Sequence, residues 1–126
     1  MTFAELPYEE RQMVTERIRG IIGTKEECIR ENMDVSERIR ARKKYDDTFQ
    51  RLAKIYITHG IKALSLAYTD EGGRKWGMTP NGKRWVLEMN NGMEERSRYC
   101  GTLWIDGEAI FTSGRIEKAF EYILNN

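Results

Sequence analysis

The fold of this chain is decided by residues 98–124, which read RYCGTLWIDGEAIFTSGRIEKAFEYIL. The first part, Arg98 to Ile105, is rich in β-branched and aromatic residues and predicts a strand. Asp106-Gly107 follows, and this pair favours a type I′ turn because both residues tolerate a positive φ at low cost. Glu108 to Thr112 then forms the returning strand. The stretch therefore predicts a β-hairpin.

The hairpin is followed by an amphipathic helix. After Ser113-Gly114, apolar residues recur at positions i, i+3, i+4, i+7 and i+8, which places them on one side of a helix. These residues are Ile116, Ala119, Phe120, Ile123 and Leu124. We expect this apolar side to pack on the hairpin.

Two further strands are predicted upstream. Lys75 to Thr79 and Lys83 to Met89 flank the turn residues at 80–82, Pro-Asn-Gly, and Asn91-Gly92 leads on toward the hairpin. The sheet is therefore predicted as a four-stranded antiparallel meander with one face covered by helices and the other at least partly wet. Alternation places Trp85, Leu87 and Met89 on one face and Arg84, Val86 and Glu88 on the other.

Residues 1–68 predict a helical layer. Pro7 suits the first turn of a helix, and Gly23 suits the position just after its end. Thr24 and Glu27 have the spacing of a capping box, in which the side chain of each residue bonds the backbone of the other. This spacing predicts a short helix that continues through Met33.

The longest predicted helix runs from Val35 to His59, after a second capping signal at Asp34. Charged residues interrupt its apolar stripe between 40 and 48, so we expect that part to project into solvent or to meet something polar. The stripe comprises Val35, Ile39, Phe49, Leu52, Ala53 and Tyr56. Residues 61–68 fit both helix and strand spacing, and we favour a helical continuation. Together the elements predict a single α+β domain over 1–126, with a helical part at 1–68 and the sheet and closing helix at 74–126.

Composition limits the classes of function. The chain has 126 residues, of which 40% are hydrophobic and 33% charged, which is typical of one globular domain. It has 21 basic and 20 acidic side chains and a net charge of +1, so binding to nucleic acid would need a local patch. Cys28 and Cys100 are far apart and are expected to be reduced thiols of a cytoplasmic protein. No apolar run approaches the about 18 residues of a membrane span.

Few residues in the sequence are candidates for catalysis or for binding a cofactor or metal. His59 is the only histidine, and close to a helix end it suits the negative end of the helix dipole. Adjacent carboxylates such as Asp46 and Asp47 are not held across a cleft, as acid and base pairs must be. Gly72-Gly73 lacks the spacing of a phosphate-binding loop. We therefore predict no catalytic, cofactor-binding or metal-binding residue and no cofactor.

One charge feature stands above the background. Residues 38–44 place five basic side chains on the long predicted helix: Arg38, Arg40, Arg42, Lys43 and Lys44. Such a cluster either contacts phosphates or an acidic partner, or it is a solvated face. A solvated face is possible because Glu37, Asp46 and Asp47 lie three or four residues from basic side chains and could pair with them along the helix.

Aromatic residues gather on the predicted sheet among basic ones. They are Trp76, Trp85, Tyr99, Trp104 and Phe111, interleaved with Lys75, Lys83, Arg84 and Arg98. Interleaved bases and aromatics are what a single-strand binding platform requires, whereas tryptophans under helices form a core. The direction of Trp76 and Trp104 relative to the helices discriminates between the two.

The C-terminal order of elements has one family resemblance. From Trp85 to Leu124 the order strand, strand, strand, helix, preceded by a helix at 48–58, is similar to the double-stranded-RNA-binding domain. That family begins its last helix with a small-residue and Lys-Lys-rich motif that grips phosphates. This chain instead has SGRIEK at 113–118, with Glu117 among only two bases, so we do not assign it to that family.

In the absence of a convergent catalytic set, the sequence favours a non-enzymatic binding protein that acts by protein–protein interaction. It is similar in character to small phage or mobile-element accessory and inhibitor proteins, including anti-defence proteins such as anti-CRISPR proteins. The alternative is a nucleic-acid binding module, for RNA or DNA, that uses the basic helix. No membrane partner is expected, and a homodimer with a seam at Tyr45 stays open. The residues expected to contact a partner are Arg38, Arg40, Arg42, Lys43, Lys44, Arg84 and Trp85.

Overall fold

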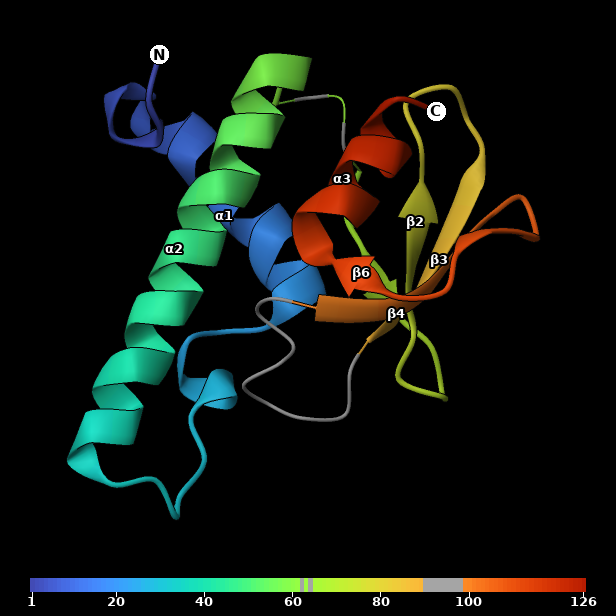
Figure 1. Ribbon diagram of the computed structural model, residues 1–126. Helices are drawn as coiled ribbons and strands as arrows, with labels where there is room; N and C mark the ends of the chain where they lie inside the picture. The colour runs from blue at the N-terminus through green and yellow to red at the C-terminus, as the bar shows by residue number, and fades with distance from the viewer. Residues whose placement is uncertain (62, 64, 90–98) are drawn as a thin grey trace.

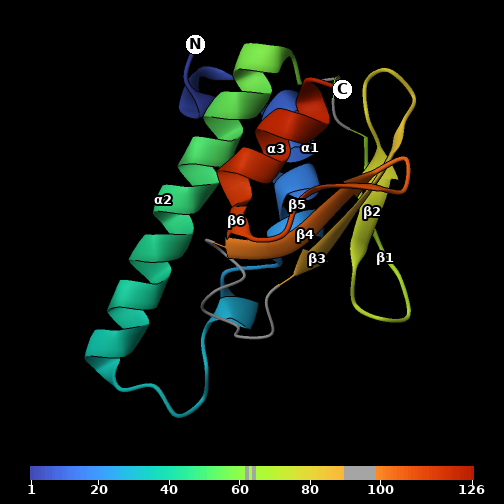
Figure 2. The same ribbon diagram turned by 45° about the vertical axis from the view of Figure 1, so that its right-hand side comes forward.

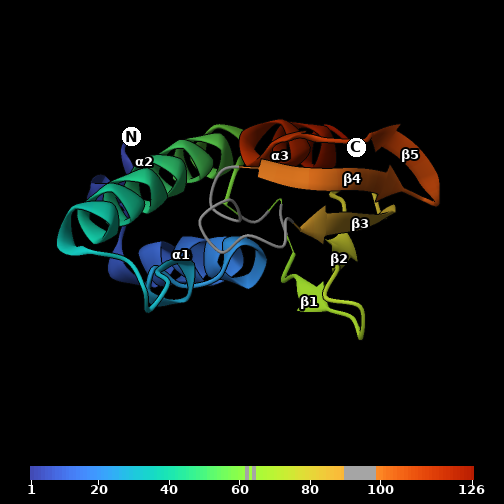
Figure 3. The ribbon, with the colours of Figure 1, turned by 60° about the horizontal axis from the view of Figure 1, so that its bottom comes forward.

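The computed structural model describes residues 1–61, 63, 65–89 and 99–126. Within this part of the chain, three α-helices lie on one side of an antiparallel sheet, which confirms the predicted α+β class (Figures 1 and 3). The helices are α1 (Tyr8–Ile22), α2 (Val35–His59) and α3 (Ile116–Leu124). Short 3₁₀ turns, η1 (Phe3–Glu5) and η2 (Glu26–Cys28), precede α1 and α2.

The sheet contains the predicted meander. Its strands are β1 (Tyr68–Thr69), β2 (Lys75–Met78), β3 (Arg84–Met89), β4 (Tyr99–Ile105), β5 (Glu108–Phe111) and β6 (Gly114–Arg115). Strands β1 to β5 are neighbours in sequence order, all antiparallel, and β6 pairs with β4. The four predicted strands are thus β2 to β5, and two short strands extend them. The predicted turn at Asn91-Gly92 and the first residue of the hairpin, Arg98, lie outside the described residues.

The hairpin turn has the predicted geometry. Asp106 has a φ of 49° and Gly107 a φ of 82°, which are the two positive values that a type I′ turn requires. The turn is also tied to β3, because the backbone N–H of Arg84 donates to Asp106 Oδ1 at 2.9 Å and the N–H of Asp106 donates to the Arg84 carbonyl at 2.7 Å. The five apolar residues of α3 are all buried against this unit.

The N-terminal helix matches its prediction, whereas the short second helix does not. Helix α1 follows Pro7 and ends before Gly23, whose φ of 82° suits the end of a helix. The Thr24 side chain accepts a hydrogen bond from the N–H of Glu27 at 3.3 Å, as a capping box requires. Only the single 3₁₀ turn η2 follows, so the prediction of a helix through Met33 is wrong. One capped turn does not offset the cost of starting a helix without further packing.

The long helix α2 has its predicted limits, Val35 and His59, but the helical continuation predicted after it is not present in the described residues. The N–H of Glu37 donates to Asp34 Oδ1 at 2.8 Å, which caps the start of α2 as expected. At the other end Gly60 has a φ of 95°, and the described residues between Ile61 and Ala67 are not helical. The predicted helical continuation over 61–68 is therefore wrong. Gly60 redirects the chain, and the Ser65 hydroxyl instead accepts a hydrogen bond from the N–H of Met78 on β2 at 3.2 Å.

The polar part of α2 is not polar all round. Ala41, Tyr45 and Thr48 are buried, and the Tyr45 hydroxyl donates to the Gly23 carbonyl at 2.6 Å. Each lies about one turn after the one before it on the same side of the helix, so they continue the buried stripe toward its start. Val35 and Ile39, which we expected in the stripe, are instead 74% and 60% exposed.

The core lies between the helices and one face of the sheet (Figure 2). Trp85 on β3 is fully buried together with Leu103 of β4, Tyr56 of α2 and Phe120 of α3. Gly77 on β2 lies opposite Trp85 in the sheet, and a Cβ atom at this position would lie 2.9 Å from the indole Nε1. The tryptophan therefore fits because position 77 has no side chain.

We expect Gly77→Ala to destabilise the fold. The added methyl group would lie too close to an indole ring that has no exposed surface, so the ring or the strand must shift, which costs about 1–3 kcal/mol in a well-packed core. Urea denaturation of the variant against the wild type measures this loss. Gly72→Ala is the matched control, because a Cβ there meets only Asp70 Oδ1 at 3.5 Å and should leave stability nearly unchanged.

The burial of Tyr45 makes the free energy of unfolding fall at alkaline pH. Burial raises the pKa of Tyr45 to about 12, above the usual value of about 10. Between these values the unfolded chain has lost the tyrosine proton while the folded chain keeps it, so the free energy of unfolding falls as the pH rises. Two pKa units correspond to about 2–3 kcal/mol.

Tyr45→Phe should therefore lose about 1 kcal/mol at pH 7, through the missing hydrogen bond to Gly23, and show a shallower decline between pH 10 and 12. Chemical denaturation at pH 7, 10 and 11 tests both parts. An unchanged alkaline slope would contradict the role of Tyr45.

Candidate functional site

The exposed side of α2 carries a row of basic residues. Arg40, Lys44, Arg51 and Lys54 lie at positions i, i+4, i+11 and i+14, and Lys43 lies beside them at i+3. All five side chains are exposed, and the row borders the buried residues Ala41 and Thr48 on one side. We call these five residues the basic row. Asp47, at i+7, is the carboxylate that lies within it.

The structure divides the cluster predicted from the sequence. Arg40, Lys43 and Lys44 belong to the basic row. Arg38 does not, because its guanidinium group donates hydrogen bonds to the carbonyls of Met33 and Glu31 at 3.1 Å each. Arg42 is exposed but projects from another side of the helix, next to Ile39. The sequence reasoning missed Arg51 and Lys54, although their helical spacing from Arg40 would have revealed them.

The neighbouring carboxylates form no ion pair with the basic row in the described residues. Asp46, expected to pair along α2, instead lies 2.7 Å from the Lys25 ammonium group across the loop. Within the described ranges none of the five basic side chains is in an ion pair. A hollow of about 300 Å³ is lined by residues 40, 43, 44, 47, 48 and 51, so four of its six lining residues belong to the basic row.

The open face of the sheet carries a second set of residues. The strand register places Tyr68, Trp76, Val86, Trp104 and Ala109 side by side across β1 to β5. This row lies on the face opposite to Trp85 and Leu87, and therefore away from the helices. Tyr68 is 53% exposed, and Met78, on the same face, is 41% exposed. We call Tyr68, Trp76, Val86, Trp104, Ala109 and Met78 together the open-face row.

Arginine side chains lie over the tryptophans of the open-face row. The guanidinium carbon of Arg84 is 4.6 Å from the ring centre of Trp76, and that of Arg74 is 5.2 Å from the ring centre of Trp104. The ring of Tyr68 lies 4.9 Å from Trp76. Cation–π and aromatic contacts of this kind hold flat side chains in fixed positions on the surface. Arg84 is thus the one predicted contact residue of the sheet that the structure places on this face.

Two further predictions concerning contact residues are corrected by burial. Trp85, predicted to meet a partner, has no exposed surface, because strand alternation turns it toward the helices. Tyr45, the candidate for a dimer seam, is 3% exposed and bonded within its own chain, so it is not available to a second copy. The sequence reasoning missed Tyr68, Arg74 and Met78, which lie in the ambiguous segment, the glycine-rich turn and a strand end.

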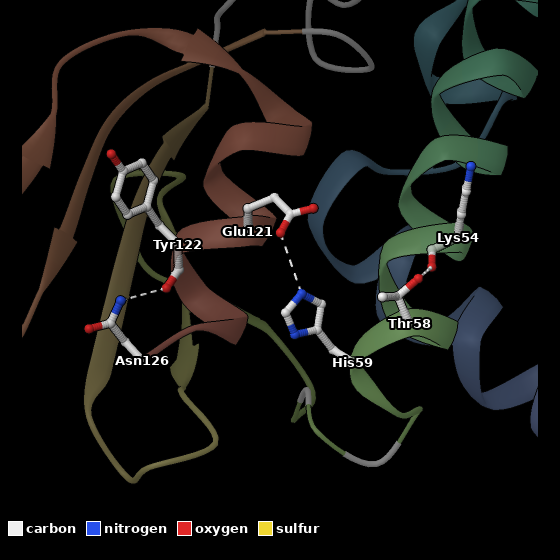
Figure 4. Close-up of polar contacts among 6 residues, drawn as sticks. All are labelled: Lys54, Thr58, His59, Glu121, Tyr122 and Asn126. Atoms are coloured by element: carbon white, nitrogen blue, oxygen red, sulfur yellow. Dashed lines mark hydrogen bonds and ion pairs between the residues drawn. The ribbon is translucent and has the colours of Figure 1, made fainter.

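The residues that carry reactive groups are engaged in structural contacts. His59 lies in the last turn of α2, and its Nε2 is 3.4 Å from Glu121 Oε2 of α3 (Figure 4). The nearby Thr58 hydroxyl donates to the Lys54 carbonyl at 2.9 Å. Burial raises the pKa of the Cys100 thiol to about 12, so this group stays protonated at neutral pH. In the described ranges no group of three or more His, Cys, Asp and Glu side chains could hold a metal ion.

Comparisons with known proteins give no relative: no protein-family model, curated protein or solved structure matches this chain. In the part of the chain that the structure describes, none of the helices combines the length and the apolar character needed to cross a membrane. Function is therefore inferred from the basic row and the open-face row.

The two classes of tryptophan should be separable by fluorescence. Trp76 and Trp104 lie on the open face, whereas Trp85 is buried. The double variant Trp76→Phe/Trp104→Phe keeps only the buried indole, so its emission should shift to shorter wavelength and its quenching by acrylamide should fall several-fold. Quenching that stays at the wild-type level would show that the open-face indoles are not accessible.

Proposed function

We propose that this chain is a non-enzymatic binding protein that acts by protein–protein interaction, with the open-face row as its contact surface. The observation that carries the proposal is the line formed by the exposed Tyr68 and the half-buried Trp76 and Trp104, held in place by Arg74 and Arg84. Exposed apolar rows rimmed by polar residues are typical of interaction sites. Tyrosine, tryptophan, arginine and methionine are also the residues enriched at the centres of protein interfaces.

The arrangement favours a protein over a single-stranded nucleic acid at this face. Base stacking needs ring faces that are free to receive a base. Trp76 already has Arg84 over its ring and Tyr68 beside it, and Trp104 has Arg74 over its ring. Glu88 is also exposed on this face, which weakens its attraction for phosphates. The complementary partner surface is an apolar patch with carboxylates at its edge, which the two arginines would meet.

A protein of this kind works by occupying the surface of its partner. An accessory or inhibitor protein, including one from a phage or another mobile element, needs no chemistry of its own for that purpose. This class and a cytoplasmic location remain our predictions. They are compatible with the structural roles of His59 and Cys100 described above.

Partner capture tests the proposal. The tagged chain is used as bait in an extract of its own cells, with and without nuclease treatment, and the partner it retains is then purified and titrated. Tyr68→Ala/Trp104→Ala should weaken that complex by at least about 30-fold, because truncation of central aromatic residues in an interface costs about 2 kcal/mol or more.

Tyr8→Ala is the matched control. Tyr8 is 67% exposed and has the guanidinium of Arg11 6.0 Å from its ring centre, but it lies on α1 and outside the open-face row. The control should bind as the wild type does. Equal binding by the sheet variant, or capture that disappears with nuclease, would overturn the proposal.

A further inference from the structure

We infer that the basic row of α2 binds the phosphate backbone of a duplex nucleic acid. This inference goes beyond the proposed function, because it concerns a different surface and a different class of partner. It depends on the placement of Arg40, Lys43, Lys44, Arg51 and Lys54 on one exposed side of a straight helix.

The dimensions of the basic row suit a duplex. Arg40 and Lys54 are fourteen positions apart, which is about 21 Å along a helix that rises 1.5 Å per residue. A duplex carries one negative charge per about 1.7 Å of its axis, so this length runs beside about a dozen phosphates. The major groove, about 12 Å wide, also admits an α-helix between its two phosphate walls.

The charges of the basic row are available for such a contact. Five basic side chains have two carboxylates near them, Asp47 within the row and Glu37 beside Arg40, while a third, Asp46, is held by Lys25 at 2.7 Å. A second hollow, of about 320 Å³, shares Arg40 and Lys44 with the first, so the two hollows adjoin along the helix. An extended polyanion can follow these adjoining hollows, whereas a single small anion would fill only part of them.

The shape of the segment also argues against an ordinary protein interface. The start of α2 extends beyond the other helices and beyond the sheet (Figures 1 and 2). The one exposed large aliphatic side chain beside the basic row is Ile39, one turn before Lys43 at its edge, and Val35 projects from another side of the helix. Protein interfaces draw their binding energy from buried aromatic and apolar anchors, whereas backbone binding to a duplex draws it from charge.

A salt titration tests the inference on the full chain. Binding to a fluorescent 20-base-pair DNA duplex of mixed sequence, and to an RNA duplex of the same sequence, is measured by anisotropy between 25 and 300 mM salt. Five phosphate contacts predict a log–log slope of about −4 to −5 with DNA. The absence of binding at 25 mM salt, or a slope shallower than about −2 with both duplexes, would overturn the inference.

The variant Arg40→Gln/Lys44→Gln/Arg51→Gln should reduce the slope by about three and weaken binding by more than about 100-fold at 0.1 M salt. The matched control is Arg42→Gln/Lys83→Gln/Arg115→Gln, which removes the same charge from exposed residues outside the basic row. Circular dichroism checks that both variants keep the fold, as expected for exposed positions. Equal losses in the two variants would show that net charge, and not the basic row, drives binding.

Two further measurements separate this inference from its alternatives. Poly-glutamate that displaces the duplex at equal charge concentration would overturn the inference in favour of an acidic protein partner. Tyr68→Ala/Trp104→Ala should leave duplex binding unchanged, because the open-face row lies on the other side of the core. The proposed protein interaction can therefore fail while duplex binding stands, and the reverse also holds.

Discussion

The packing of all three helices on a single face of the sheet is the constraint on which the rest of the structure depends. Trp85 is at the centre of that packing, and its indole occupies the space that the absent side chain of Gly77 leaves free. Because residues alternate between the faces of a strand, burying Trp85 and Leu87 commits Arg84 and Val86 to the other face. The neighbouring strands follow the same register, and this brings Trp76 and Trp104 to either side of Val86. The open-face row is thus a direct result of how the core is filled.

The same constraint explains the exposed charge of α2. The helix is 25 residues long, and its C-terminal half packs against α1 and α3 through residues such as Leu52 and Tyr56. Toward its start the buried residues are Ala41, Tyr45 and Thr48, and the Tyr45 hydroxyl donates to the Gly23 carbonyl just after α1. The remaining circumference meets solvent, where long basic side chains are stable without partners. A narrow contact of this kind holds the helix in place and leaves the basic row open.

The sequence predicted best those parts that local interactions decide. Asp106-Gly107 and the apolar spacing of α3 are signals within a few residues of each other, and both predictions were confirmed. The limits of α2 were also predicted correctly, whereas the path of the chain after Gly60 and the role of Tyr45 were harder to see. A tyrosine, an alanine and a threonine among charged residues do not resemble an apolar stripe, and Tyr45 is buried because a distant carbonyl, that of Gly23, accepts its hydroxyl.

Surface rows that cross several strands were also beyond sequence reasoning. The row from Tyr68 to Trp104 requires the register of β1 to β4, which no local pattern specifies, and Tyr68 came from a segment assigned to a helix. Trp85 shows the opposite error. Its alternation with Leu87 already placed it under the helices, but its aromatic character suggested a contact residue. The place of Trp85 in the core follows from the alternation of the strand and not from its aromatic character.

The exposed first turns of α2 have a consequence for local stability. Val35 and Ile39 bury little surface, and the first core residue of the helix is Ala41. Apart from the Asp34 cap, the contacts that fix this end are the bonds from Arg38 to two carbonyls of the preceding loop. These turns can fray and re-form while the core stays intact, so their backbone amides exchange with solvent far faster than those around Leu52.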